Sequence, residues 1–132
     1  MNIEQMKSSL QNKPKFMNKV TAWREIEGRE GKYEDLPLKL DSRLKNVLKN
    51  KNIDKLYSHQ REAFEYIADE NDTVVVTPTA SGKTLCYNLP VLDSILKDEN
   101  SRALYLFPTK ALSQDQLSGL YDLIQALDEN IK

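Results

Sequence analysis

The sequence TVVVTPTASGKT, residues 73–84, joins a run of β-branched residues to a polar loop that ends on Gly82, Lys83 and Thr84. Because β-branched side chains pack well in sheets, residues 73–77 are predicted to form a buried strand. Apolar residues then recur at helical spacing from residue 82 to about residue 97, with Pro90 expected to kink or tighten that helix. A strand, a Gly-Lys-Thr loop and a helix in this order predict a phosphate-binding loop.

The loop departs from the strict G-x-x-x-x-G-K-[ST] pattern at one position, because Thr77 replaces the first glycine. In such a loop Gly82 lets the backbone approach the phosphates, and the Lys83 ammonium bridges the β- and γ-phosphates. The Thr84 hydroxyl is expected to hold Mg²⁺. The alternative is a helix start without a ligand, which the positive charge of Lys83 at a helix N-terminus disfavours. The predicted nucleotide-binding residues here are Thr77, Pro78, Thr79, Ala80, Ser81, Gly82, Lys83, Thr84 and Leu85, with Lys83 and Thr84 as the catalytic pair.

The remaining pattern alternates strands and helices. A second strand is expected at residues 103–107, followed by a helix from Lys110 or Ser113 to Leu127. This alternation is typical of a parallel α/β sheet with flanking helices. Two earlier helices are expected, over residues 38–50 with Asp41 or Ser42 as N-cap, and over residues 58–69 with Ser58 as N-cap. Residues 20–37 are predicted to be mostly extended or irregular, and the first 18 residues to be either helical or disordered.

Composition narrows the class of protein. The chain of 132 residues is 39% hydrophobic and 30% charged, which fits one small globular domain or part of a larger one. A single cysteine, Cys86, and a single histidine, His59, exclude a disulfide framework and a multi-ligand zinc site within these residues. No apolar run approaches membrane-spanning length and the N-terminus is polar, so we expect a cytoplasmic protein.

The two signs of charge are segregated along the chain. Residues 1–60 hold 13 lysines and arginines against 8 acidic residues, whereas residues 61–132 hold 6 against 12. Two solvated surfaces explain this distribution, and so does a basic part that meets nucleic acid. Charge alone leaves both explanations open.

Three motifs in order resemble the first RecA-like domain of a superfamily 2 helicase. Tyr57-Ser-His-Gln60 is similar to the adenine-reading Q-motif, TPTASGKT (residues 77–84) to motif I, and PTKALSQDQ (residues 108–116) to motif Ia. Superfamily 2 tolerates a residue other than glycine at the position of Thr77. The longer pattern LYSHQ…TPTASGKTLCYNLPVL…RALYLFPTKALSQDQ most resembles the bacterial MrfA/YprA-type DNA-repair helicases, which are DEAD/DEAH-box (DExH) proteins.

This resemblance implies a fold and a division of the chain. The implied fold is a truncated P-loop NTPase (RecA-like) domain of the α/β class, with parallel strands, flanking helices and a helical N-terminal extension. Residues 1–37 are then the extension, and residues 38–132 an incomplete helicase ATP-binding domain. In the family two further strands lie between those of motifs I and Ia, and they have no counterpart here. Residues 73–77 and 103–107 should therefore pair with each other non-natively or leave their edges unpaired.

The resemblance also implies ligands. ATP and Mg²⁺ are the expected cofactors, and Gln60 is expected to read the adenine edge with its carboxamide. A solvated helix residue is the alternative for Gln60. At the position of the family's base-stacking aromatic residue this sequence has Arg43 among polar neighbours. His59, Cys86 and Tyr87 are interpreted as packing or capping residues.

Motif Ia implies contacts with the backbone of a single-stranded or partly duplex nucleic acid, DNA more than RNA, and with no membrane. The alternative is an ordinary strand-to-helix cap. The implied contact residues are Pro108, Thr109, Lys110 and Gln114.

The acid pair that completes such a site is missing, because no Asp-Glu-x-His occurs in the sequence. The resemblance implies that the parent protein is an ATP-dependent DNA helicase acting in repair. The present chain should be its N-terminal portion, which binds ATP without hydrolysing it. A stand-alone nucleotide- or nucleic-acid-binding module is the alternative. A small P-loop kinase is disfavoured because Arg102 is the only arginine after Arg61.

Overall fold

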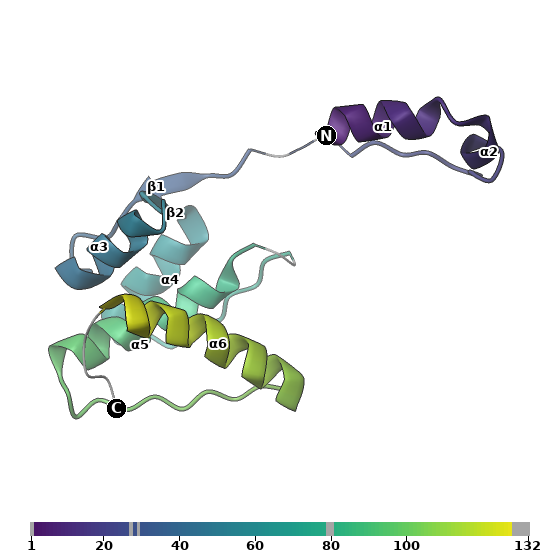
Figure 1. Ribbon diagram of the computed structural model, residues 1–132. Helices are drawn as coiled ribbons and strands as arrows, with labels where there is room; N and C mark the ends of the chain where they lie inside the picture. The colour runs from purple at the N-terminus through teal and green to yellow at the C-terminus, as the bar shows by residue number, and fades with distance from the viewer. Residues whose placement is uncertain (1, 27, 29, 79–80, 128–132) are drawn as a thin grey trace. The chain divides into compact units, whose positions relative to one another are not determined.

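The computed structural model describes residues 2–26, 28, 30–78 and 81–127 (Figure 1). The contacts divide the chain into two compact units, Met1–Glu30 and Gly31–Lys132. Among the described residues, no helix combines the length and apolar character needed to cross a membrane.

The first unit contains two short helices, α1 (Ile3–Gln11) and α2 (Pro14–Met17). Helix α1 begins with a capping box, in which Asn2 and Gln5 each bind the other's backbone N–H through their side-chain oxygens, at 2.9 and 3.0 Å. The Glu25 carboxylate accepts hydrogen bonds from Lys7 Nζ at 2.7 Å and from the indole N–H of Trp23 at 3.3 Å. These exposed contacts tie α1 to the segment that follows α2.

The second unit opens with a small antiparallel sheet that the sequence did not indicate. Strand β1 (Tyr33–Asp35) pairs with β2 (Lys55–Tyr57), and Tyr33 lies opposite Tyr57. Just before β1 the backbone approaches this tyrosine pair closely, because a Cβ at Gly31 would lie 2.8 Å from the Tyr57 ring. The sheet thus brings residues 31–35 next to the segment that leads into the predicted Q-motif.

Four helices form the rest of this unit: α3 (Ser42–Asn50), α4 (Ser58–Ala68), α5 (Lys83–Lys97) and α6 (Lys110–Leu127). All four were predicted, and α5 continues through Pro90. Asp41 caps α3 by accepting from the N–H of Arg43 at 2.8 Å. The expected cap of α4 is wrong. Its N-cap is Tyr57, whose N–H donates to Gln60 Oε1 at 2.9 Å, so Ser58 is already the first helical residue.

Helices α3, α4, α5 and α6 and strand β2 share one apolar core. Phe64 of α4 and Leu89 of α5 are fully buried in it. One buried carboxylate also joins the helices, because Asp93 of α5 accepts from the backbone N–H of Asp41 at 2.8 Å. The core residues are Leu40, Leu44, Val47, Leu48, Leu56, Phe64, Leu89, Leu92, Leu123 and Leu127.

The expected parallel strands are absent from the described part of the chain. Residues 73–77 and 103–107 run as extended segments outside any sheet, and β1 with β2 forms the one sheet that the described residues contain. Alternate side chains stand in solvent: Val74 and Val76 are each 89% exposed, Leu104 85% and Leu106 83%. The alternation of exposed and covered side chains is that of a strand. A strand is stable only when its backbone N–H and C=O groups form hydrogen bonds with a neighbouring strand. Of the two arrangements expected for these segments, the unpaired one is found.

Candidate nucleotide-binding site

The loop between residue 77 and α5 closes on a glycine that no other residue can replace without strain. Gly82 is the N-cap of α5 and adopts φ 74°, in the left-handed region. A Cβ there would also lie 2.6 Å from Nε2 of Gln60. Both the backbone conformation and the close approach of a side chain therefore require glycine. Thr79 and Ala80, two of the predicted nucleotide-binding residues, lie outside the described residues.

The Lys83 ammonium is enclosed by oxygen atoms of its own loop. It donates to the carbonyl oxygens of Pro78 at 2.6 Å and Thr77 at 3.0 Å, and to the hydroxyls of Thr77 and Ser81, each at 3.2 Å. The two hydroxyls are themselves 2.6 Å apart. Thr77, which replaces the usual glycine, thus adds a side-chain hydrogen-bond acceptor for the lysine. All these partners are uncharged, so phosphate oxygens can compete for the ammonium.

The side chain of Gln60 connects the predicted Q-motif to the loop. Its Nε2 donates to the carbonyl oxygen of Gly82 at 2.8 Å, while its Oε1 accepts from the N–H of Tyr57. Only 4% of Gln60 is exposed, so the alternative of a solvated helix residue is wrong. His59 contacts the same loop, with Nε2 3.0 Å from the carbonyl oxygen of Ser81. Two side chains from the first turn of α4 therefore contact the carbonyl groups of two consecutive loop residues, Ser81 and Gly82.

Tyr57, whose backbone binds Gln60, belongs to an aromatic stack whose outer member was not predicted from the sequence. The rings of Tyr33 and Tyr57 stack with centroids 4.7 Å apart, and the ring of His59 follows at 5.6 Å from Tyr57. Tyr33 is 55% exposed. Its hydroxyl lies 3.2 Å from that of Tyr57, and this hydrogen bond raises the pKa of Tyr33. The pairing of β1 with β2 places Tyr33 next to Tyr57. A strand of three residues is too short to show the alternation of apolar and polar residues by which strands are predicted.

Thr84, the predicted metal ligand, is bound to a residue of α6. Its hydroxyl donates to Oε1 of Gln116 at 3.1 Å, and the Tyr87 hydroxyl donates to the same oxygen at 2.6 Å. Gln116 was not among the predicted site residues, although it closes the motif Ia segment PTKALSQDQ. Leu85 is half-buried against the core. Cys86 is buried as expected of a packing residue, and burial raises the pKa of its thiol.

The predicted nucleic-acid contacts lie together at the start of α6. Pro108, Thr109, Lys110 and Gln114 are all exposed. The Thr109 hydroxyl accepts from the N–H of Leu112 at 3.2 Å, as an N-capping side chain does. Capping occupies one lone pair and leaves the hydroxyl proton available to an acceptor.

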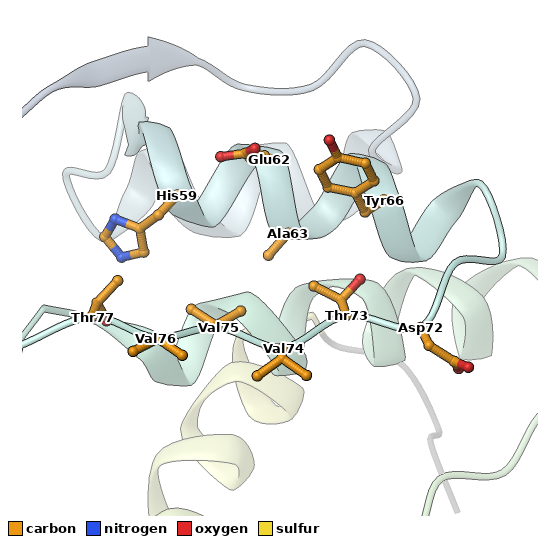
Figure 2. Close-up of a pocket in the computed structure, with 10 residues that line it drawn as sticks. All are labelled: His59, Glu62, Ala63, Tyr66, Asp72, Thr73, Val74, Val75, Val76 and Thr77. Carbon is orange, nitrogen blue, oxygen red and sulfur yellow. The ribbon is translucent and has the colours of Figure 1, made fainter.

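A cavity of about 370 Å³ adjoins the loop between α4 and residues 72–77 (Figure 2). His59 and Ala63 face it from the helix, while Val75 and Thr77 point toward α4 from the extended segment. Val74 and Val76 point away from the helix (Figure 2). Gln60 is not among its lining residues, so the cavity is distinct from the predicted adenine contact.

The residues present fit part of a magnesium site. Among the described residues no group of three His, Cys, Asp or Glu side chains could hold a metal ion. Mg²⁺ bound to a nucleotide keeps several waters and needs few protein ligands besides the phosphates. The Thr84 hydroxyl at the start of α5 meets that smaller requirement.

Sequence comparison identifies the family. The model for the DEAD/DEAH box helicase family matches residues 57–132. The chain belongs to the DEAD/DEAH box helicases. The matched region begins at Tyr57 and therefore contains all three motifs predicted from the sequence of this helicase chain.

Individual relatives confirm the resemblance to MrfA/YprA-type helicases. The helicase chain is 56% identical over 113 residues to "Uncharacterized ATP-dependent helicase YprA" of Bacillus subtilis, covering 86% of the chain. It is 41% identical over 96 residues to ATP-dependent helicase hrq1 of Schizosaccharomyces pombe, covering 72% of the chain. The crystal structure of the DUF1998 helicase MrfA bound to DNA and AMPPNP matches all of the chain with a TM-score of 0.83 and 49% identity. These matches support a RecA-like P-loop fold.

The helicase chain spans a small part of these proteins. It covers 15% of YprA, 9% of hrq1 and 18% of the MrfA chain. The activities of the whole proteins therefore belong to chains much longer than this one.

Proposed function

We propose that this chain is the ATP- and nucleic-acid-binding N-terminal portion of an ATP-dependent DNA helicase acting in DNA repair, and that it binds Mg·ATP without hydrolysing it. The observation that carries the proposal is the enclosure of the Lys83 ammonium by neutral loop oxygens beside the N-terminus of α5. An ammonium and a helix N-terminus at the same place form an anion site. The relatives that are named as ATP-dependent helicases support the same assignment.

On nucleotide binding, Lys83 exchanges the carbonyl oxygens of Thr77 and Pro78 for phosphate oxygens. Gly82 adopts the left-handed conformation at the end of the loop and leaves room for Gln60, so the chain can turn into α5 beside the phosphates. Mg²⁺ would neutralise phosphate charge when bound, and Thr84 is the residue that would hold it. The sequence holds no Asp-Glu-x-His, the acid pair that would polarise an attacking water, so binding rather than hydrolysis is the expected activity.

Base recognition is assigned to Gln60 and Tyr33. Gln60 has one free lone pair on Oε1 and one free N–H on Nε2 beyond the two bonds it makes, so it can serve the adenine edge while it holds Gly82. The exposed ring of Tyr33, stacked on Tyr57 of the same predicted motif, supplies a face for the base.

Nucleic acid is assigned to the exposed start of α6. Lys110 brings positive charge, and the first N–H groups of an 18-residue helix favour a phosphate. Contacts of this kind carry no sequence information, so we propose binding to the backbone of single-stranded or partly duplex DNA. The resemblance further assigns residues 38–132 to the ATP-binding domain and residues 1–37 to an extension.

Equilibrium titration with ATP and Mg²⁺ tests the nucleotide assignment. We expect ATP binding without release of phosphate, and loss of binding in Lys83→Ala. Lys49→Ala is the control, because that lysine is exposed on α3 and removes the same charge away from the loop. Equal binding by the chain and Lys83→Ala would refute the assignment.

The DNA assignment has its own test. In Lys110→Ala, binding of a single-stranded oligonucleotide should weaken by the same factor for every sequence. The slope of log affinity against log salt concentration should also become smaller, by the equivalent of about one phosphate contact. The coding sequence after codon 132 distinguishes the helicase from the alternative of a stand-alone binding module. A strand ending in Asp-Glu-x-His within about 100 further residues, the size of a small domain, supports the helicase.

A further inference from the structure

Two hydroxyls of α5 converge on one oxygen of α6. Thr84 Oγ1 and the Tyr87 hydroxyl oxygen lie 3.1 and 2.6 Å from Gln116 Oε1. Thr84 and Tyr87 are three residues apart and share a face of α5, so a single side chain can serve both. Gln116 is half-buried at this junction.

The neighbours of Gln116 fix which end of its carboxamide faces the hydroxyls. Its other terminal atom lies 3.3 Å from the carboxylate of Asp115. An ionised carboxylate can only accept, so the nitrogen faces Asp115 and the oxygen faces α5. An amide oxygen also only accepts, which means that both hydroxyls must donate to it.

This arrangement orients the hydroxyl group of Thr84. Because its proton is directed at Gln116, both lone pairs of its oxygen point elsewhere. A metal ion requires a lone pair and is repelled by a hydroxyl proton. Thr84 is therefore held in the orientation that leaves its oxygen open to a cation.

The packing around the contact keeps it in place. The Tyr87 ring meets that of Tyr105 edge to face, with centroids 5.9 Å apart. The Tyr105 hydroxyl in turn donates to the buried Asn88 at 3.1 Å. At the far end of α6, Leu123 anchors the helix in the core. The acceptor therefore stands on a helix that is fixed independently of the phosphate loop.

We propose that Gln116 is a positioning residue that directs the Thr84 proton away from the nucleotide and so prepares the Thr84 oxygen to bind Mg²⁺. The inference rests on the proposed function, because it assumes that Thr84 meets a nucleotide-bound metal ion. It assigns a role to a residue of α6, which lies outside the phosphate loop and its helix.

The test compares ATP affinity with MgCl₂ and with EDTA, by calorimetry on the 132-residue chain under conditions where circular dichroism shows its helices formed. In Gln116→Leu we expect the Mg²⁺-dependent gain in affinity to fall about 3- to 10-fold, the effect of one hydrogen bond. ATP affinity in EDTA should not change. Gln116→Glu keeps an acceptor for both hydroxyls and should retain the gain. Gln125→Leu, an exposed position on the same helix, is the matched control.

A double variant separates positioning from a general structural effect. If Gln116 acts through Thr84, then Thr84→Ala with Gln116→Leu should show the same Mg²⁺-dependent gain as Thr84→Ala alone. An unchanged gain in Gln116→Leu would overturn the inference and leave the proposed function standing. Equal losses in MgCl₂ and in EDTA would also overturn it, because they indicate only altered packing. Absence of any ATP binding by the unaltered chain would overturn both.

Discussion

The side-chain amide of Gln60 donates a hydrogen bond to the backbone carbonyl of Gly82 over 2.8 Å. The two residues are 22 positions apart in the sequence and belong to the predicted Q-motif and the predicted phosphate loop. The bond holds the residue from which α5 starts. In the proposed function, base recognition and phosphate binding therefore depend on one side chain.

Loss of the Gln60 bond should destabilise the loop and the fold together. In Gln60→Glu the N–H of Tyr57 keeps its acceptor, but a carboxylate faces the Gly82 carbonyl, and two acceptors repel. We expect the free energy of unfolding to fall by about 1–3 kcal/mol, the cost of an unsatisfied buried group. Urea denaturation measures this free energy, with Glu62→Gln, at an exposed position of the same helix, as the control. A midpoint equal to that of the unaltered chain would contradict the role of this bond.

Gly82→Ala should remove nucleotide binding. The substitution combines a left-handed φ of 74° with a Cβ 2.6 Å from Gln60 Nε2, so α5 cannot start as it does now. Gly119→Ala is a matched control in α6, where an added Cβ meets nothing within 4 Å. That variant should be more stable by about 0.5–1 kcal/mol, because alanine favours a helix interior. ATP titration and thermal unfolding of both variants check the contrast.

Tyr33 should contribute to ATP binding and not to phosphate binding. Tyr33→Leu removes the exposed ring of the stack, and we expect ATP affinity to fall about 5-fold, within the range of an aromatic contact. Affinity for tripolyphosphate, which has no base, should stay the same. Tyr66→Leu, an exposed tyrosine at the far end of α4, is the control. A parallel loss for both ligands would show that Tyr33 acts on the loop instead.

Acid should weaken the junction of α3 and α5 through Asp41. The side-chain hydrogen bonds from Arg43 hold the pKa of Asp41 below its usual range, against a smaller opposing effect of burial. Because the folded-state pKa is the lower one, the stabilisation is complete above the unfolded pKa of about 3.9 and is lost as pH falls through the folded value.

Urea midpoints between pH 2 and pH 6 test this. Asp41→Asn keeps an oxygen to cap α3 but loses the charge, so its midpoint should depend less on pH than that of the unaltered chain. The two chains should converge at the acid end. If the urea midpoints of the two chains changed with pH in the same way, Asp41 would contribute nothing to the pH dependence of stability.

The predictions from sequence succeeded where a signal is local. Asp41 caps α3, and Gly82 is followed directly by α5, because capping and positive φ depend on a few adjacent residues. They failed where the partner is distant. β1 and β2 are three residues each and have no period to read, so Tyr33 could not be placed beside Tyr57. Residues 73–77 have the composition of a strand, but they form one only if another strand pairs with them, and composition does not reveal whether such a partner is present.

The sequence by itself determined the family, the order of its motifs and the chemistry of the loop, because Gly82, Lys83 and Thr84 are adjacent and their spacing is covalent. The tertiary structure decided which side chains complete that loop. Packing of α4 against α5 and of α6 against α3 brought Gln60 to Gly82 and Gln116 to Thr84, across 22 and 32 residues. Such contacts follow from how the helices share one core, and no local pattern records them.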